Sequence, residues 1–519
     1  MESAERSLRA PHRRFGDSGH RRKEYRPRRN LSLYAGRFPD VQTFPGDRAG
    51  DLVMRAKVEA SRNELSNADE TTEGRVMNRL IEMVPWSRRL RGVVALSVAL
   101  VLAGCDTAEL LEVDLPGNVT ADDIENPSLA GTMRVSAIGD FEWAWDEYVD
   151  FAAKHSDEYI QSSGNFTGRR LQIRDIPANE PRYQDNIFGR LHRARVMLES
   201  HFDRLQTFSD ADVLNRTQYL AEMRTYGGFI YVVFGEGFCG TPLNGDGVVR
   251  TPEQLLEIAV EQFTEALSIA GQLGTSRGQA LVQAARIGRA RAYLNLDQYA
   301  SAIADAQSIV DDPALDFYAT REYGENRREN SMANTNELDT NQQSTVAPSY
   351  RDVRWKGVPD PRVTVMETGL IGHDNATIVW RHNKTPESFP AGAAQDVIIA
   401  SSREARMIIA EASALTGDLA TAISIMDDFH TAAGIPPITA EDVPTQDDVI
   451  RQVIEERRRE FFVEGGHRQR DHLRWRGTQF NIPYLGEPGS DHPNGVDQYG
   501  QVYGTTTCFP IAQNEQVGS

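Results

Sequence analysis

The side chains best suited to metal chemistry lie near the C-terminus, where two histidines and two carboxylates share one helical stretch. His467 and Asp471 are four residues apart and fall on one helical face, with Glu464 about one turn earlier. Imidazole and carboxylate groups are zinc ligands, but His472 is rotated off that face and no further strong ligand is evident. The neighbouring arginines favour a structural network of ion pairs. We therefore predict no metal here.

Motifs of common catalytic sites are absent from residues 105–519. This segment contains no HExxH, GxSxG or phosphate-loop pattern. A glycosidase needs only two carboxylates that meet in space, which no motif search detects, so this class stays open as a third alternative. The prediction is a protein that is not an enzyme and needs no cofactor.

A second group of residues suits ligand binding. The irregular residues 319–394 contain Tyr350, Arg354, Trp355 and Trp380 among Asn, Asp and Arg. Long irregular segments inside compact domains are usually functional or disordered loops. Indole rings stack on the apolar faces of sugars while polar side chains bind the hydroxyls, although a peptide would use the same residue types. We predict the ligand site here, with Tyr350, Arg354 and Trp355 at its centre.

The elements that position these residues are predicted to be helices. Apolar residues recur at helical spacing over five stretches, which are 126–155, 183–205, 211–238, 251–271 and 277–312. Trp143 and Trp145 lie two apart in the first stretch, so at least one of them should be core. Trp475, further along, is also expected to pack.

Two segments have the pattern of paired helices. Residues 277–312 and 402–435 each read as two antiparallel helices with small residues on the facing sides, which resembles a tetratricopeptide pair. Two recognisable pairs indicate that more degenerate ones precede them. Residues 364–372 and 375–383 are β-like. The predicted fold is mainly α, with tetratricopeptide-like helix pairs, irregular loop-rich insertions and a few short strands.

A targeting signal is predicted at residues 77–104. Three arginines precede an apolar run of about a dozen residues, too short for the roughly 30 Å hydrocarbon core of a bilayer. The run ends in Leu-Ala-Gly-Cys, which resembles the bacterial lipobox. We therefore expect lipidation of Cys105, which anchors the mature chain to a membrane through lipid alone.

Residues 1–76 are then unexpected, because a signal peptide should be N-terminal. They are basic and have little apolar periodicity, so they would not build a core. The segment is either an over-extended reading frame, with initiation at Met77 or Met83, or a disordered basic arm.

Charge separates these parts of the chain. Residues 1–104 hold 20 of the 56 basic and 13 of the 75 acidic residues, which leaves 36 basic against 62 acidic residues in 105–519, a net charge of −26. Such a surface repels nucleic acid and anionic lipid. Nucleic-acid binding is therefore excluded as a function.

Residues 454–475, IEERRREFFVEGGHRQRDHLRW, carry a family resemblance. They closely resemble the signature helix of the SusD/RagB family of outer-membrane nutrient-uptake lipoproteins, through Glu456, Arg457, Arg459, Glu460, Glu464, Gly465, His467, Arg468, Asp471 and Arg474. Gly466 is one extra residue within the motif, so a local bulge is expected. The lipobox, the stretch FGEGFCGTPL and the terminal CFPIAQNE agree with the family. The family's asparagine-rich tail is absent from this sequence, which leaves truncation of the C-terminus as an open alternative.

The resemblance spans residues 105–519 and implies a function. Members of the family capture glycans or peptides at the cell surface and pass them to a partner SusC-like TonB-dependent transporter, without catalysis. Phe166 and Arg169, in the loop SSGNFTGRR, are further ligand-binding candidates because the family often recruits that region. The alternative is a tetratricopeptide-type scaffold on the cell envelope that binds only proteins.

Two cysteines remain once Cys105 is lipidated. Cys239 and Cys508 would lie in an oxidising setting at the envelope or outside the cell, where spare cysteines are more often paired than free. We predict a Cys239–Cys508 disulfide that holds the end of the chain against the early helices.

Overall fold

A computed structural model describes residues 125–513, except 244, 246, 326, 335–341 and 387. The predicted extension 1–76, the signal peptide 77–104 and Cys105 lie outside the described residues, and so does the C-terminal end from 514. The described residues all fall within one compact unit.

Helices make up most of the described chain, which confirms the predicted mainly α fold. The α-helices are α5 (Ala130–His155), α6 (Phe166–Gln172), α7 (Arg190–Thr207), α8 (Arg216–Gly237), α9 (Pro252–Ala270), α10 (Ser276–Asn295), α11 (Tyr299–Ala306), α12 (Phe389–Ala393), α13 (Ser402–Thr416), α14 (Leu419–Ala433), α15 (Gln446–Glu460) and α16 (His467–Trp475). A π-helix, η2 (Tyr183–Gly189), leads into α7, and short 3-10 turns are η1 (Pro127–Leu129), η3 (Pro313–Leu315), η5 (Pro348–Tyr350) and η6 (Pro361–Val363).

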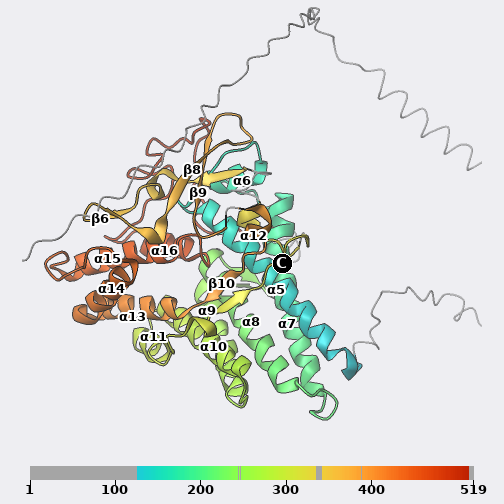
Figure 1. The fold of residues 1–519 in the computed structure, drawn as a ribbon. Coiled ribbons are helices and arrows are strands. Elements are labelled where there is room, and N and C mark those ends of the chain that lie inside the picture. Colours follow the sequence, from blue (N-terminus) through green and yellow to red (C-terminus); the bar gives the residue numbers. More distant parts are fainter. Residues whose placement is uncertain are drawn as a thin grey trace, which may run out of the picture. The chain divides into compact units, whose positions relative to one another are not determined.

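Helices close in the sequence pack side by side as pairs (Figure 1). The α10–α11 and α13–α14 pairs correspond to the two tetratricopeptide-like segments predicted from the sequence, and α8–α9 and α5–α7 pack in the same way. In α10 the small residues Ala285 and Ala292 are fully buried, because they allow the neighbouring helices to approach closely. Thr251 starts α9 through a reciprocal capping box with Gln254, after which Pro252 occupies the first helical position.

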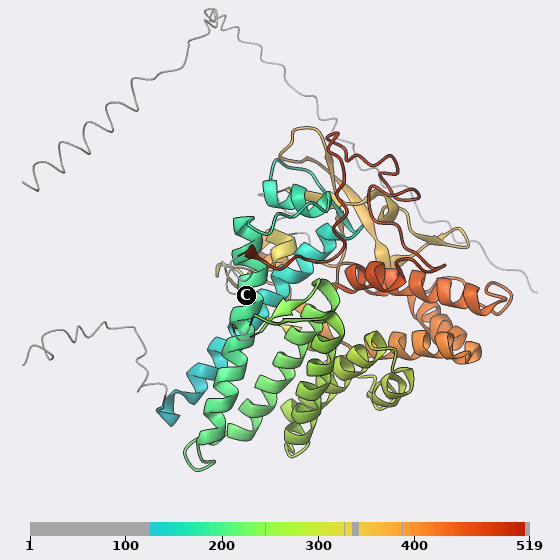
Figure 2. The ribbon, with the colours of Figure 1, turned by 180° about the vertical axis from the view of Figure 1, so that it is seen from behind.

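The strands form five separate two-stranded antiparallel sheets. The pairs are β1 (Tyr159–Gln161) with β5 (Ser344–Val346), β2 (Thr241–Pro242) with β3 (Val249–Arg250), β4 (Phe317–Ala319) with β10 (Val397–Ala400), β6 (Arg354–Trp355) with β7 (Val358–Pro359), and β8 (Val365–Ile371) with β9 (Ile378–His382). The β8–β9 hairpin lies beside α6 and the C-terminal loops, on one side of the helix pairs, in both views (Figures 1 and 2).

The family signature is not one helix, which corrects the sequence prediction. α15 ends at Glu460 and α16 begins at His467, with a turn between them. Gly465 and Gly466 have φ of 56° and 71°, the left-handed region that favours glycine. A Cβ at Gly466 would lie 2.5 Å from Cε1 of Tyr148, so the turn also needs glycine for close approach.

The charged residues of the signature form the predicted ion-pair network. Arg457 and Arg474 both pair with Asp471, at 3.0 and 2.9 Å, and with Glu411 of α13, at 3.2 and 2.6 Å. Burial alone would raise the pKa of the Asp471 carboxyl, but the two guanidinium groups hold it below its ordinary value. Among the described residues no group of three metal-ligating side chains is positioned to hold an ion.

Among the described residues, the tryptophans outside the predicted ligand site pack as expected. Trp145 is fully buried, whereas Trp143 is half-buried between the guanidinium groups of Arg190 and Arg327, 3.5 and 4.3 Å from its ring centroid. Trp475 is buried in a second hydrophobic cluster, formed mainly by α13, α14 and α15.

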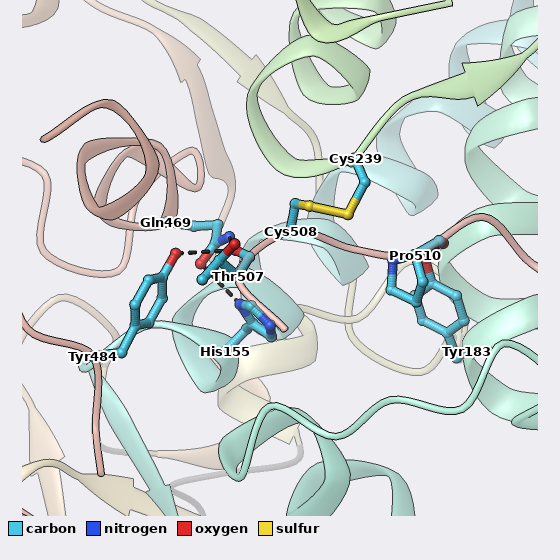
Figure 3. Close-up of a disulfide and its surroundings, with 8 residues drawn as sticks. All are labelled: His155, Tyr183, Cys239, Gln469, Tyr484, Thr507, Cys508 and Pro510. Carbon is cyan, nitrogen blue, oxygen red and sulfur yellow. Dashed lines mark hydrogen bonds between the residues drawn. A yellow bond between two sulfur atoms is a disulfide. The ribbon is translucent and has the colours of Figure 1, made fainter. Parts of the chain in front are cut away.

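The C-terminal tail is tied to the early helices (Figure 3). Cys239, just after α8, and Cys508 form a disulfide, the pairing predicted from the sequence. Beside it, the Cys239 N–H donates to the Phe509 carbonyl at 3.0 Å. The Gln469 amide and the Tyr484 hydroxyl both donate to the Thr507 carbonyl, at 2.7 and 3.0 Å. The tail is therefore an integral part of the fold.

In the part of the chain that the structure describes, no helix has the length and apolar character needed to cross a membrane.

Candidate functional site

Tyr350, predicted at the centre of the ligand site, is a core residue. It is fully buried, and its ring stacks on Phe462 with centroids 4.5 Å apart and an interplanar angle of 17°. Its hydroxyl lies 3.4 Å from Oδ1 of Asp157, and burial raises its pKa well above the ordinary value. A ligand cannot stack on this ring in the structure, so this part of the predicted site is corrected.

Trp355 packs on one side and is half-buried. It lies on β6, with its ring edge-on to His430 at 5.2 Å and against the second hydrophobic cluster. Its neighbour Arg354 is exposed and bonded locally, to Asp352 at 2.7 Å and to the Gly357 carbonyl at 3.0 Å. The β6–β7 hairpin therefore packs on α14, and the indole of Trp355 is not free to stack on a ligand.

Trp380 is also engaged in packing. It lies half-buried on β9 against the main hydrophobic core, and the guanidinium of Arg351 lies 5.1 Å from its ring centroid. The two tryptophans predicted to bind ligand thus serve the packing of two different hydrophobic clusters.

Phe166 and Arg169, the other two candidates, lie on an accessible surface. Phe166 begins α6 and has 58 % of its surface exposed. One helical turn later, the Arg169 guanidinium lies over the ring of Tyr499, 3.8 Å from its centroid, while its Nε donates to the Ser163 carbonyl at 2.9 Å. The structure therefore brings α6 together with Tyr499 from the C-terminal loops, which the sequence did not predict.

The tip of the β8–β9 hairpin completes this surface. The Tyr499 hydroxyl donates to Oδ2 of Asp374 at 2.7 Å, and the Asp374 N–H donates to the Ser162 carbonyl at 3.0 Å. Gly372 allows the approach, because a Cβ there would lie 2.3 Å from the Ser162 carbonyl oxygen. The hairpin tip, α6 and Tyr499 are therefore held together by side chains and backbone.

Hydrogen bonding shifts the pKa values of Asp374 and Tyr499 on this surface. Burial would raise the pKa of the Asp374 carboxyl, but hydrogen bonds from Thr377, Ala376 and Tyr499 hold it below its ordinary value. Burial and the Asp374 acceptor together raise the pKa of Tyr499 to about 12. Near neutral pH Asp374 is therefore an ionised carboxylate, held by these hydrogen bonds, and Tyr499 is a neutral phenol.

Amide side chains extend the surface into a small pocket. The Asn165 side chain caps α6 by accepting from the Gly168 N–H at 2.9 Å, and its amide donates to Oε1 of Gln343 at 2.9 Å. Asn165, Gln343 and Gln161 line a polar pocket of about 150 Å³. We call the set Phe166, Arg169, Tyr499, Asp374, Asn165 and Gln343 the α6 surface.

The α6 surface has the chemistry of a binding site for polar rings. An exposed phenyl ring offers an apolar face, and amide, carboxylate and guanidinium groups beside it offer donors and acceptors. Sequence reasoning missed Tyr499, Asp374, Asn165 and Gln343. Asp374 lies between the two β-like runs, where a turn is needed, but nothing in the sequence indicated where the C-terminal loops would fold.

Comparison with known proteins gives a family match for the C-terminal part of the chain. Residues 404–515 match the model of the SusD family. These residues are a SusD family segment. They contain the turn and ion-pair network described above, so the SusD/RagB resemblance predicted from the sequence is confirmed. No curated protein sequence matches the chain.

Solved structures of the SusD superfamily share the fold over nearly their whole length. A SusD superfamily protein from Bacteroides vulgatus has a TM-score of 0.58 at 16 % identity, covering 76 % of this chain and 98 % of that one. A SusD-like carbohydrate binding protein from the same species has a TM-score of 0.59 at 14 % identity, covering 75 % and 96 %. A SusD superfamily protein from Bacteroides thetaiotaomicron reaches 0.53 at 15 % identity, covering 74 % and 97 %. This likeness establishes the SusD fold for the chain.

Proposed function

We propose that this SusD-like chain captures oligosaccharides at the cell surface and delivers them to a partner TonB-dependent outer-membrane transporter. The observation that carries the binding step is the α6 surface, where exposed Phe166 lies beside the Arg169–Tyr499 stack and the Asn165–Gln343 amides. The SusD family segment and the fold shared with a SusD-like carbohydrate binding protein support the same role.

A sugar fits this surface through complementary groups. The ring C–H face stacks on Phe166, and the hydroxyls exchange hydrogen bonds with Asn165 and Gln343. The chain binds the sugar and releases it intact, because its role is capture. A peptide ligand would use the same residue types, so a binding experiment must distinguish an oligosaccharide from a peptide.

Anchoring follows from the lipobox. The mature chain begins at Cys105, acylated and held on the outer face of the outer membrane, and residues 1–104 are absent from it. Its strongly acidic composition contributes polar contacts to the transporter interface that weaken as salt rises. Intact-mass analysis of protein extracted from native membranes tests the start site directly.

The function is tested by binding and by co-purification. Full-length protein is screened against neutral oligosaccharides and against peptides, and the mass of the recovered ligand is measured by mass spectrometry. We expect saturable binding of oligosaccharides, recovered uncleaved, and a transporter in mild-detergent pull-downs at low salt. Protein partners without any soluble ligand would instead indicate the scaffold alternative, and shortened sugars would indicate a glycosidase.

A further inference from the structure

A second concave region lies between α15 and the chain that follows α16. It is a cleft of about 410 Å³, within the range of roughly 300–1,000 Å³ usual for small-molecule sites, and it shares no lining residue with the α6 surface. One wall is the stripe Arg451, Ile454, Glu455 and Arg458 of α15. The other wall is formed by residues 480–491. We call this region the α15 cleft.

The α15 cleft contains a buried cation with an unused donor. Arg468 of α16 lines the cleft with only 6 % of its surface exposed, and its Nε and Nη2 donate to the Asp157 carboxylate at 2.7 and 2.6 Å. Its Nη1 has no hydrogen-bond partner among the described residues. Buried charged donors in folded proteins are normally satisfied, so this N–H group lacks an acceptor, which a ligand oxygen would supply.

Two more arginines extend the cationic lining. Arg458 donates through Nη2 to the Ser349 carbonyl at 2.9 Å, while its Nε is buried without a partner among the described residues. The Arg451 guanidinium lies 5.0 Å from the centroid of the Phe480 ring and donates to the Gln479 carbonyl at 2.8 Å. Unused guanidinium N–H groups therefore come from two neighbouring helices.

The carboxylates of the cleft already have partners. Asp157 accepts both bonds from Arg468, Glu455 accepts from Arg458 at 3.3 Å, and Asp491 accepts from the Ser349 N–H at 2.9 Å. The buried donors without a partner, on Arg468 and Arg458, are cationic, so they favour an anionic oxygen. A planar carboxylate matches the fork of N–H groups on a guanidinium.

The remaining lining suits a sugar ring. Phe480, Ile482 and Pro483 offer an apolar wall, whereas Asn481 and Ser490 offer neutral polar groups. We propose that the α15 cleft binds a uronate, a sugar ring that carries a carboxylate, with the carboxylate on Arg468 and Arg458 and the ring face on Phe480. This site is separate from the neutral-glycan site of the α6 surface and does not depend on it.

The direct test is calorimetry of the full-length protein with tetramers of galacturonate and of glucuronate. Their methyl esters keep the ring and remove the charge, maltotetraose is the neutral control, and trialanine supplies a peptide carboxylate. We expect at least one uronate tetramer to bind and its methyl ester to bind at least tenfold more weakly, with affinity falling as salt rises.

Variants locate the site. Phe480→Ala removes the apolar wall, and Arg458→Lys keeps the charge but removes the Nε donor; each is expected to weaken uronate binding about tenfold or more. A third cleft variant, Arg451→Gln, has a matched control in Arg406→Gln. Arg406 also lies over a phenyl ring, that of Phe429 at 4.9 Å, but it is ion-paired to Asp428 and lies away from the cleft. Arg451→Gln should weaken binding and Arg406→Gln should not, with thermal melts confirming that all variants fold.

The proposal is overturned if neither uronate tetramer binds, if the methyl esters bind equally well, or if Arg406→Gln weakens binding as much as the cleft variants do. Trialanine binding that is sensitive to the cleft variants, without uronate binding, would also overturn it and would assign the cleft to peptides. Because Phe166→Ala leaves the cleft intact, its loss of neutral-glycan binding is read independently of these outcomes.

Discussion

Arg169 lies over the ring of Tyr499, with its guanidinium carbon 3.8 Å from the ring centroid, and so joins α6 to the C-terminal loops. Tyr499 in turn donates to Asp374 at the tip of the β8–β9 hairpin. Three segments far apart in the sequence thus meet at one residue. The α6 surface exists only when all three are folded together.

This relationship predicts a measurable coupling between two side chains. In a double-mutant cycle, Arg169→Ala and Tyr499→Leu should each lower the free energy of unfolding, and the coupling energy should be about 0.5–1 kcal/mol. Urea unfolding of the four proteins measures it. Additive effects of the two substitutions would mean that the stack does not stabilise the surface.

Trp355 is predicted to stabilise the fold. Trp355→Ala should lower the free energy of unfolding by about 2 kcal/mol, because the half-buried indole packs on His430 and the second hydrophobic cluster. Arg354→Ala, at the exposed neighbouring position, should change it by less than about 0.5 kcal/mol. An unchanged unfolding midpoint combined with lost ligand binding would instead support the sequence-based assignment of Trp355 to the ligand site.

The sequence was informative where the signal is local. Helical spacing and small residues within 277–312 predicted α10 and its close packing, because periodicity reports which face of a helix is buried. The prediction that Tyr350 binds ligand was wrong because its stacking partner, Phe462, lies on a distant segment of the chain. The polar, irregular sequence around Tyr350 gives no sign that its ring is buried.

The remaining errors have the same physical origin. The turn between α15 and α16 depends on Gly466 packing against Tyr148 of α5, a long-range contact that no local pattern shows. Tyr499 lies in a loop without periodicity, so its contact with Arg169 could not be predicted. The α6 surface was therefore only half predicted, through Phe166 and Arg169.

The disulfide should contribute strongly to stability. It closes a loop with a sequence separation of 269, and the chain-entropy model assigns on the order of 5 kcal/mol to loops this long, as an upper estimate. Cys239→Ser, Cys508→Ser and the double variant should therefore be destabilised by similar amounts, as measured by urea unfolding. Alkylation of both thiols in denatured, unreduced wild-type protein would rule the bond out.

Stability should also depend on pH through Glu158. Burial raises the pKa of its carboxyl from 4.5 to about 8, although the Val463 N–H donates to it at 2.7 Å. The folded protein then holds a proton that the unfolded chain loses, so this group lowers the free energy of unfolding as pH rises from about 4.5 to about 8.

The test of that dependence compares Glu158→Gln with the wild type. The variant cannot ionise, so its free energy of unfolding should fall less steeply between pH 5 and 8, by up to about 1.4 kcal/mol per pH unit. Glu257→Gln, at an exposed position on α9, is the control and should keep the wild-type slope. Equal slopes for Glu158→Gln and the wild type would show that Glu158 is ionised in the folded protein.

The central claim, capture of an oligosaccharide at the α6 surface, is tested most directly by calorimetric titration of Phe166→Ala. The ligand is the oligosaccharide identified by the binding screen, and Leu214→Ala, which truncates a residue with 92 % of its surface exposed in the α7–α8 loop, is the control. Phe166→Ala should weaken binding by about 2 kcal/mol, roughly thirtyfold, while the melting temperature stays within a degree or two and Leu214→Ala binds as the wild type does. Equal affinity of Phe166→Ala and the wild type would contradict the claim.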